Sequence, residues 1–286
     1  METFKRYSKA IWFSVGWFIT FVMMQTFYMV VALLFKMITD TDYLITVQQL
    51  LEQVDSNDVN ALMNAYMEII GSVTSYIEIF LAIGMSGLFV IDREIHKERF
   101  ALNKIKITDI PQFITLGILM NIISTIFINM FSYETLVETG YSTSTSLMLQ
   151  GGFFGILIGV GICAPICEEI AFRYFIYHNL SRGNRVLAII ASSLLFGLAH
   201  GNILQGFYAF VFGIVFTLFN IKYNSIIPSL IMHISVNSLS VVLVSVESAE
   251  MQILLMAMIF LLSLIPTSII LISRIVKHKK NTVEQL

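Results

Sequence analysis

Six side chains of the types used in catalysis lie within long apolar stretches of this sequence: Glu168, Glu169, Arg173, His200, His233 and Asn237. A carboxylate, two imidazoles and an amide around water form a hydrolytic set, with a base that deprotonates the water, a group that positions it, and donors for an oxyanion. The same residue types also suit a divalent metal, for which Glu168, His200 and His233 are candidate ligands. Both chemistries fit these residues.

Spacing assigns the six side chains to helix faces. Residues four apart share a helix face, whereas adjacent residues diverge by about 100°. Glu169 and Arg173 are therefore expected to pair, which leaves Glu168 pointing elsewhere and available. His233 and Asn237 are also four apart and project together. The structural alternatives are a salt bridge for the first pair and a helix–helix hydrogen bond for the second.

Other residues in the apolar stretches are less informative. Glu78 has no companion in the sequence, so a functional role competes with simple pairing to a neighbouring helix. Cys163 and Cys167 are interpreted as small packing residues. Pro165 predicts a kink just before Glu168, where a freed carbonyl could line a wet pocket.

The elements that position these residues must lie in lipid. Of the 286 residues, 57 % are hydrophobic and 13 % charged, against about 45–50 % and 25 % in soluble domains. The mean hydropathy is +0.81. This composition excludes a water-soluble protein. The 17 basic and 19 acidic residues lack the basic excess that a nucleic-acid partner requires.

The sequence predicts an all-α integral membrane protein, because eight apolar stretches approach the roughly 20 residues that cross a bilayer. Residues 1–286 then form a single multi-pass domain, with the candidate catalytic residues on helices four, five and seven. The first stretch is interpreted as a retained signal anchor. Connection 37–66 holds an amphipathic stretch at 47–63 that is expected on the outer surface. The eight stretches are 10–35, 67–91, 113–131, 147–180, 186–200, 206–221, 226–246 and 251–273.

Basic residues predict the orientation, since they collect on the cytoplasmic side of membrane proteins. They alternate with acidic or uncharged connections along the chain, with Lys36 as the exception. Both termini are therefore expected in the cytoplasm, with the protein in the cell membrane. The basic segments are Lys5, Arg6 and Lys9; Arg93, Lys97, Arg99, Lys104 and Lys106; Arg182 and Arg185; Lys222; and Arg274, Lys277, Lys279 and Lys280.

Three motifs on three of the expected helices resemble a known family. Residues 168–173 fit EExxxR, residues 196–200 fit FxxxH, and residues 233–237 fit HxxxN. In this order and at these separations they are similar to the CAAX prenyl endopeptidase type II family, also called the CPBP or Abi family of intramembrane proteases. The Ile-, Met- and Asn-rich composition suits a bacterial member from an AT-rich organism. The family core is expected at 147–246.

The resemblance implies an endopeptidase that cuts a membrane-associated peptide or protein, with its site open toward the cytoplasm. Glu168 would be the general base that activates water, and His200 would help to hold that water. Glu169 and Arg173 would be a supporting pair, and His233 and Asn237 would stabilise the oxyanion. The resemblance leaves the cofactor open between a divalent metal such as zinc and none.

Two other functions fit a membrane protein of this kind. The first is a non-catalytic scaffold, or an immunity or regulatory protein, that binds a membrane partner. The intact motifs argue against it, because a scaffold does not need them. The second is a proton-coupled transporter with Glu168 and Glu78 as relay acids, which the absence of inverted repeats disfavours.

Overall fold

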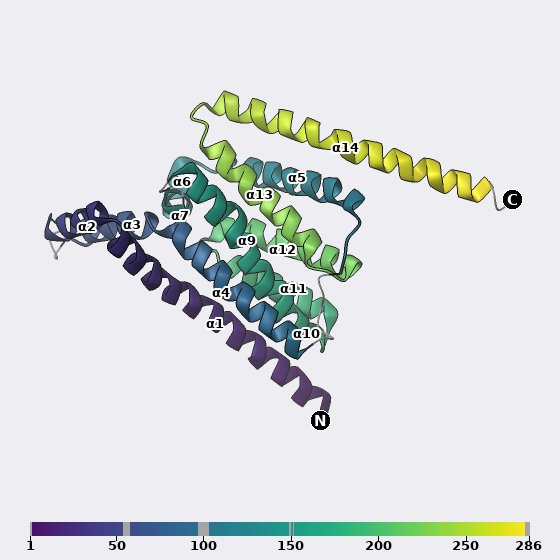
Figure 1. The fold of residues 1–286 in the computed structure, drawn as a ribbon, viewed down its shortest axis with the longest axis horizontal. Coiled ribbons are helices and arrows are strands. Elements are labelled where there is room, and N and C mark those ends of the chain that lie inside the picture. The colour runs from purple at the N-terminus through teal and green to yellow at the C-terminus, as the bar shows by residue number, and fades with distance from the viewer. Residues whose placement is uncertain (1, 54–57, 97–102, 149, 151, 284–286) are drawn as a thin grey trace.

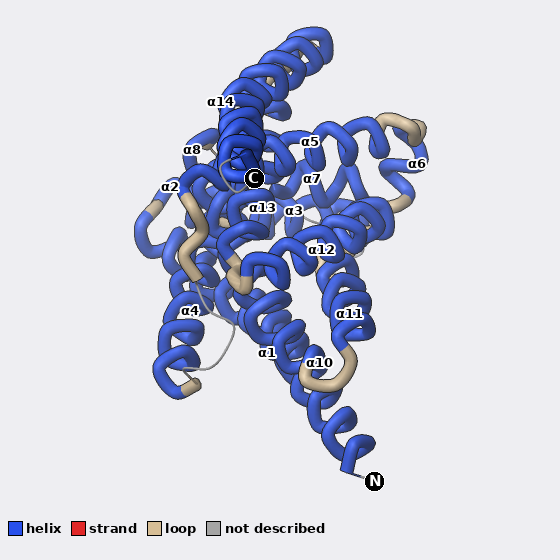
Figure 2. Tube along the Cα trace, turned by 90° about the vertical axis from the view of Figure 1, so that its right-hand side faces the viewer, coloured by secondary structure: helices blue, strands red, loops and turns tan. Residues whose placement is uncertain are grey.

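The chain is a multi-pass helical membrane protein. The computed structural model describes residues 2–53, 58–96, 103–148, 150 and 152–283, and every regular element in these ranges is a helix (Figures 1 and 2). Seven helices are long and apolar enough to cross a membrane. The predicted all-helical membrane class is confirmed. The segments with these spans are α1 (Glu2–Thr39), α4 (Thr74–Ile95), η1 (Ile107–Asp109) with α5 (Ile110–Ile128), α8 (Phe153–Ile156) through α10 (His178–Ser181), α12 (Ile203–Tyr223), α13 (Ile227–Val244) and α14 (Ala249–Val283).

The expected fifth span is the one that is too short to cross the membrane alone. Stretch 186–200 corresponds to α11 (Arg185–Leu198), which has 14 residues. At 1.5 Å per residue it is about 21 Å long, against roughly 30 Å of hydrocarbon. If α11 enters at the bilayer surface, it ends inside the membrane. His200 follows its last turn and therefore also lies inside the membrane.

Two other expected boundaries differ from the structure. Expected span 67–91 is divided at residues 72–73, where α3 (Val59–Gly71) ends and α4 begins. The amphipathic stretch 47–63 is not one helix, since α2 (Thr41–Gln53) and α3 are separate and residues 54–57 lie outside the described part. Lys97 and Arg99, in the predicted cytoplasmic loop, also lie outside it. The hydropathy of 67–91 is continuous, so composition alone could not show the break.

The helix that contains the glutamate pair is irregular. Residues 153–181 form one helix in which η2 (Leu157–Cys163) and η3 (Glu169–Tyr177) are π-helical and flank α9 (Ala164–Glu168). Pro165 has no N–H, so it cannot bond to the carbonyl four residues earlier. That carbonyl, of Gly161, accepts instead from Ser238 Oγ at 3.3 Å, and the Val160 carbonyl accepts from Asn237 Nδ2 at 3.1 Å. Side chains of α13 therefore satisfy the backbone where the α-helical pattern is broken.

This irregular helix is also the centre of the core. All nine residues of η3 are buried, and its aromatic side chains pack against α1, α4 and α11. Trp17 stacks on Phe175 with ring centroids 3.7 Å apart, and Phe196 contacts Phe172 edge-on at 5.3 Å. In Figure 1, α1 and α4 run beside α9 and α10. The glutamates are thus held by a packed scaffold.

Glycines allow α11 and α12 to pack closely. A Cβ added at Gly197 would lie 2.5 Å from the Gly206 carbonyl oxygen, and one at Gly213 would lie 2.9 Å from Ser193 Cβ. Small residues at such contacts are typical of membrane helix pairs. The connection turns through Gly201, at φ +73°, and Asn202 caps α12 by accepting from the Gln205 N–H at 2.8 Å. This tight turn fixes where His200 lies.

The last helix lies on the periphery. Figure 1 shows α14 along one side of the bundle, and none of its residues from 249 to 275 is buried inside the protein. Polar contacts attach it to α5. Thr115 Oγ1 lies 2.9 Å from both the Ser263 carbonyl and Thr267 Oγ1, and Arg274 pairs with Asp109. Most of the surface of α14 is therefore free to face lipid.

Candidate active site

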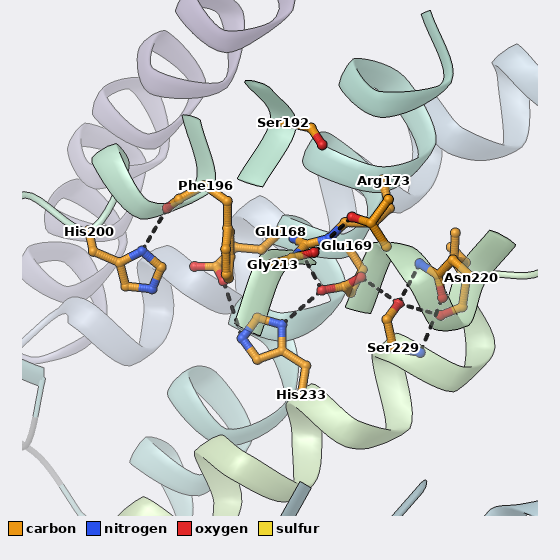
Figure 3. A network of polar contacts seen from close by, with 12 residues as sticks. Glu168, Glu169, Arg173, Ser192, Phe196, His200, Gly213, Asn220, Ser229 and His233 are labelled. Atoms are coloured by element: carbon orange, nitrogen blue, oxygen red, sulfur yellow. Dashed lines mark hydrogen bonds and ion pairs between the residues drawn. The ribbon is translucent and has the colours of Figure 1, made fainter. Parts of the chain in front are cut away.

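Glu169 is the centre of a buried polar network (Figure 3). Its Oε1 lies 3.4 Å from Arg173 Nη1 and 3.0 Å from His233 Nδ1, and its Oε2 accepts from Ser229 Oγ at 2.5 Å. The side chains of Glu169 and Arg173 are 0 % and 1 % exposed. Arg173 and Glu169 are therefore an ion pair, as their spacing predicts, and the carboxylate has three partners on two helices.

Two members of this network are absent from the sequence-based set. Asn220 Nδ2 donates to Ser229 Oγ at 2.7 Å, and the Ser229 N–H donates to Asn220 Oδ1 at 3.3 Å. Both residues are fully buried. Asn220 lies near the end of α12 and Ser229 near the start of α13. The only signal for this network in the sequence is the Asn220 amide inside an apolar stretch. Asn220 is next to the end of the predicted span 206–221, where a polar residue is ordinary, so the sequence does not single it out.

Glu168 differs from its neighbour. Its side chain is 20 % exposed, and its Oε2 has no hydrogen-bond partner among the described residues. His233 Nε2 approaches that oxygen to 3.4 Å, close enough for a charge interaction but without hydrogen-bond geometry. His233 therefore lies between the two glutamates, with Nδ1 toward Glu169 and Nε2 toward Glu168. The Glu169 carboxylate thus has all its partners within the protein, whereas the Glu168 carboxylate has an oxygen without a hydrogen-bond partner among the described residues.

His200 is held by the last turn of α11, the helix that precedes it. Its Nδ1 lies 2.8 Å from the Phe196 carbonyl oxygen, which can only accept, so Nδ1 is the protonated nitrogen. In the neutral ring, Nε2 is then an acceptor. His200 is partly exposed and lines the same cavity as Glu168. Its orientation is thus suited to accepting a hydrogen bond from a small polar ligand.

Phe196, the first residue of the FxxxH motif, links these groups. Its ring lies edge-on to His200 and His233, at 5.0 and 5.6 Å between centroids. The Arg173 guanidinium lies 4.2 Å from the centre of the same ring. Cation–π contact of this kind partly compensates a buried charge, and Arg173 Nη2 has no hydrogen-bond partner in the described part of the chain. The phenyl ring therefore positions two imidazoles and covers the cation.

A cavity of about 390 Å³ adjoins this network. Glu168, His200, His233 and Asn237 are all on its wall, so the structure brings together residues of all three predicted motifs. Glu169 and Arg173 are not on the wall and lie behind it. Much of the remaining wall is apolar, and it includes Ala164, Phe196, Phe212, Phe216 and Val236.

The structure also places the residues whose roles were left open. Glu78, on α4, lines the cavity that Glu168 lines. Cys167 is fully buried with Sγ 3.9 Å from the Glu78 carbonyl oxygen, and Cys163 is half-buried. Both cysteines are free. The packing role fits Cys167. Glu78 lines the cavity, although it has no nearby partner in the sequence that would have indicated this.

The donor set does not form a metal site. No three His, Cys, Asp or Glu side chains in the described ranges are grouped so that they could hold a metal ion. The nitrogens of His233 both face carboxylates, which leaves Glu168 and His200 as the remaining candidates from the predicted set. Zinc sites use three or four protein ligands.

Comparison with known proteins identifies one segment. Residues 150–239 match the family model of Rce1-like type II CAAX prenyl endopeptidases. The six candidate residues and both additional members of the buried network lie within this segment. No curated protein and no solved structure matches the chain.

Proposed function

We propose that this chain, whose residues 150–239 are a Rce1-like type II CAAX prenyl endopeptidase domain, is an intramembrane endopeptidase. Its reaction is hydrolysis of a peptide bond in a membrane-associated peptide or protein. The observation that supports this best is the contrast between two adjacent glutamates. Glu169 is fully paired in the core, whereas the Glu168 side chain is 20 % exposed, lines the cavity together with His200 and His233, and has a buried Oε2 with no hydrogen-bond partner among the described residues.

Glu168 is the general base in this proposal. Water between the Glu168 carboxylate and His200 Nε2 would donate one hydrogen bond to each. Its oxygen attacks the scissile carbonyl carbon while one proton moves to Glu168. The tetrahedral intermediate then expels the amine, which takes that proton from Glu168, and the products are a carboxylic acid and an amine. Glu168 thus begins and ends the cycle ionised.

His233 and Asn237 are the proposed oxyanion donors. An imidazolium at position 233 would donate from Nε2, and Glu169 behind the ring would stabilise its charge. Asn237 Nδ2 has two hydrogens, of which one bonds to the Val160 carbonyl. The second hydrogen is available to a ligand in the cavity that Asn237 lines. Arg173 offsets the charge of Glu169 without touching the substrate.

The test uses full-length protein in lipid nanodiscs with a set of single-span peptides, and the products are identified by mass spectrometry. Wild-type protein should cleave at least one peptide. Glu168→Gln keeps the shape of the side chain but not its basicity, so cleavage should fall roughly 10²-fold or more. Glu138→Gln, at an exposed carboxylate on α6 (Tyr133–Glu138), is the matched control and should cleave normally.

Full activity in Glu168→Gln would reject this mechanism. A protein that cleaves nothing, and whose cellular phenotype survives Glu168→Gln, would point to the scaffold function instead. A chelator arm in the same assay tests the metal. Because the donor set lacks a third ligand, activity should survive exhaustive chelation, with no bound metal by elemental analysis.

A further inference from the structure

The cavity beside Glu168 extends toward one end of the helix bundle. Its wall reaches the first residue of α4 (Thr74), the residue after α5 (Asn129) and the last residue of α13 (Val244). It also includes Gln205 in the first turn of α12 and Gln252 in the first turn of α14. All these positions belong to helix ends on the same side, because consecutive helices run in alternating directions.

Charge distinguishes this end from the other. The connections at the cavity end are acidic, and Lys36 is the one basic residue there among those described. We call it the acidic end; its acids include Asp40, Asp42, Asp58, Glu134, Glu138, Glu247 and Glu250. We call the opposite end the basic end; its described basic residues include Lys9, Arg93, Lys106, Arg182, Lys222 and Arg274.

The site is packed shut toward the basic end. The side chains of Phe172, Phe175 and Tyr177 there are at most 4 % exposed. Ser229 lies between His233 and the basic end on α13, and Asn220 lies near the basic end of α12. Both residues are 0 % exposed. None of the described residues that line the cavity lies in the last turn of α10 or α12 or in the first turn of α13. A peptide would therefore reach Glu168 from the acidic end.

Basic residues collect on the cytoplasmic side of membrane proteins, so the acidic end faces away from the cytoplasm. We infer that the site is entered from the extracytoplasmic side, and that its substrate is a membrane-anchored peptide whose scissile bond is presented there. This inference rests on the proposed function for its substrate. It departs from the cytoplasmic opening that the family resemblance implies, because that opening and the charge-based orientation cannot both hold for this cavity.

The shape of the cavity limits the substrate. His233 and Val244 are eleven residues apart on α13, so the cavity is about 16 Å deep along this helix. An extended peptide covers that depth with about five residues. The wall beside the path is largely apolar, as at Ile128, Phe212 and Val236, whereas Tyr141 and Thr145 of α7 (Tyr141–Met148) supply hydroxyls nearer the end. An apolar peptide stretch next to the scissile bond fits this wall.

The test is cysteine accessibility in sealed membrane vesicles of both orientations. Ser240→Cys and Thr145→Cys place a thiol on the cavity wall, and Arg182→Cys places one at the basic end. The probe is a membrane-impermeant anionic methanethiosulfonate, and mass spectrometry locates the modified cysteine, which separates it from Cys163 and Cys167. Both cavity variants should react from the extracytoplasmic side only, and Arg182→Cys from the cytoplasmic side only.

Cleavage by the modified proteins supplies the second readout. Modified Ser240→Cys should lose at least tenfold in activity, because the adduct fills the peptide path, while modified Arg182→Cys should cleave normally. Reaction of either cavity variant from the same side as Arg182→Cys would overturn the inference. If wild-type protein cleaves nothing, the proposed function fails, while the labelling pattern still decides which side the cavity faces.

Discussion

At the scale of single residues, the two glutamates of one motif show how burial separates chemical roles. Glu169 has an arginine, a histidine and a serine as partners, and it is out of contact with the cavity. Glu168 lines the cavity, and its buried Oε2 has no hydrogen-bond partner among the described residues. A buried carboxylate is costly unless it is hydrogen-bonded. The network around Glu169 therefore fixes His233, and Glu168 remains free to accept a proton.

Ser229→Ala tests this division of roles. The change removes the 2.5 Å bond to Glu169 Oε2 and leaves the Asn220 amide without its acceptor. An unsatisfied buried group costs about 1–3 kcal/mol, so we expect a lower melting temperature and a roughly tenfold fall in kcat with little change in KM. Ser245→Ala, at an exposed hydroxyl on the C-cap of α13, is the control and should change neither. An unchanged kcat in Ser229→Ala would contradict the positioning role.

At the scale of elements, a short helix and a tight turn place His200. The α11 helix packs against α12 through Gly197 and Gly206, and the chain reverses within residues 199–202. Because α11 is shorter than the seven helices that are long enough to cross a membrane, the ring at position 200 lies beside the cavity. The approach of the two helices therefore determines where the proposed water-holding nitrogen lies.

Gly197→Ala should push these helices apart. The new Cβ would lie 2.5 Å from the Gly206 carbonyl oxygen, a backbone atom that cannot rotate away. Overpacking of this kind costs about 1–3 kcal/mol, so we expect a lower melting temperature in detergent together with reduced cleavage. Gly87→Ala is the matched control, because nothing lies within 4 Å of its Cβ and it gains the same helix propensity. Equal melting temperatures for the two variants would refute the close-packing argument.

At the scale of the whole molecule, the two ends of the bundle differ in charge and in access. The basic end is closed by packed aromatic residues, and the acidic end leads to the cavity. The same alternation of charge that predicts the orientation also predicts which solvent compartment reaches Glu168. Because the cavity opens at one end of the bundle, the orientation of the protein in the membrane determines on which side a substrate can reach Glu168.

Reporter fusions check the orientation on which this depends. Alkaline phosphatase, which is active only outside the cytoplasm, should be active when fused after Gly140, between α6 and α7. It should be inactive when fused after Arg185 or at the C-terminus, where green fluorescent protein should fluoresce. The reverse pattern would place the acidic end in the cytoplasm and remove the basis for extracytoplasmic entry.

Composition and local spacing alone indicate the lipid environment, the helical class and the side chains available for catalysis. An apolar composition with few charges, arranged in runs that approach roughly 20 residues, indicates membrane helices, and the spacing of Glu169 and Arg173 indicated their ion pair. The three motifs also indicated the segment that the family model matches. These features depend on composition and local periodicity, which a linear sequence displays directly.

The remaining features of the site depend on how the helices pack. Only packing shows that Ser229 and Asn220 complete the Glu169 network, that Glu78 faces the same cavity as Glu168, and that Asn237 satisfies a carbonyl of η2. The break before α4 and the direction of the cavity are likewise invisible to hydropathy. Each of these depends on contacts between residues distant in the chain, where burial, and not the identity of a residue, determines what its side chain can do.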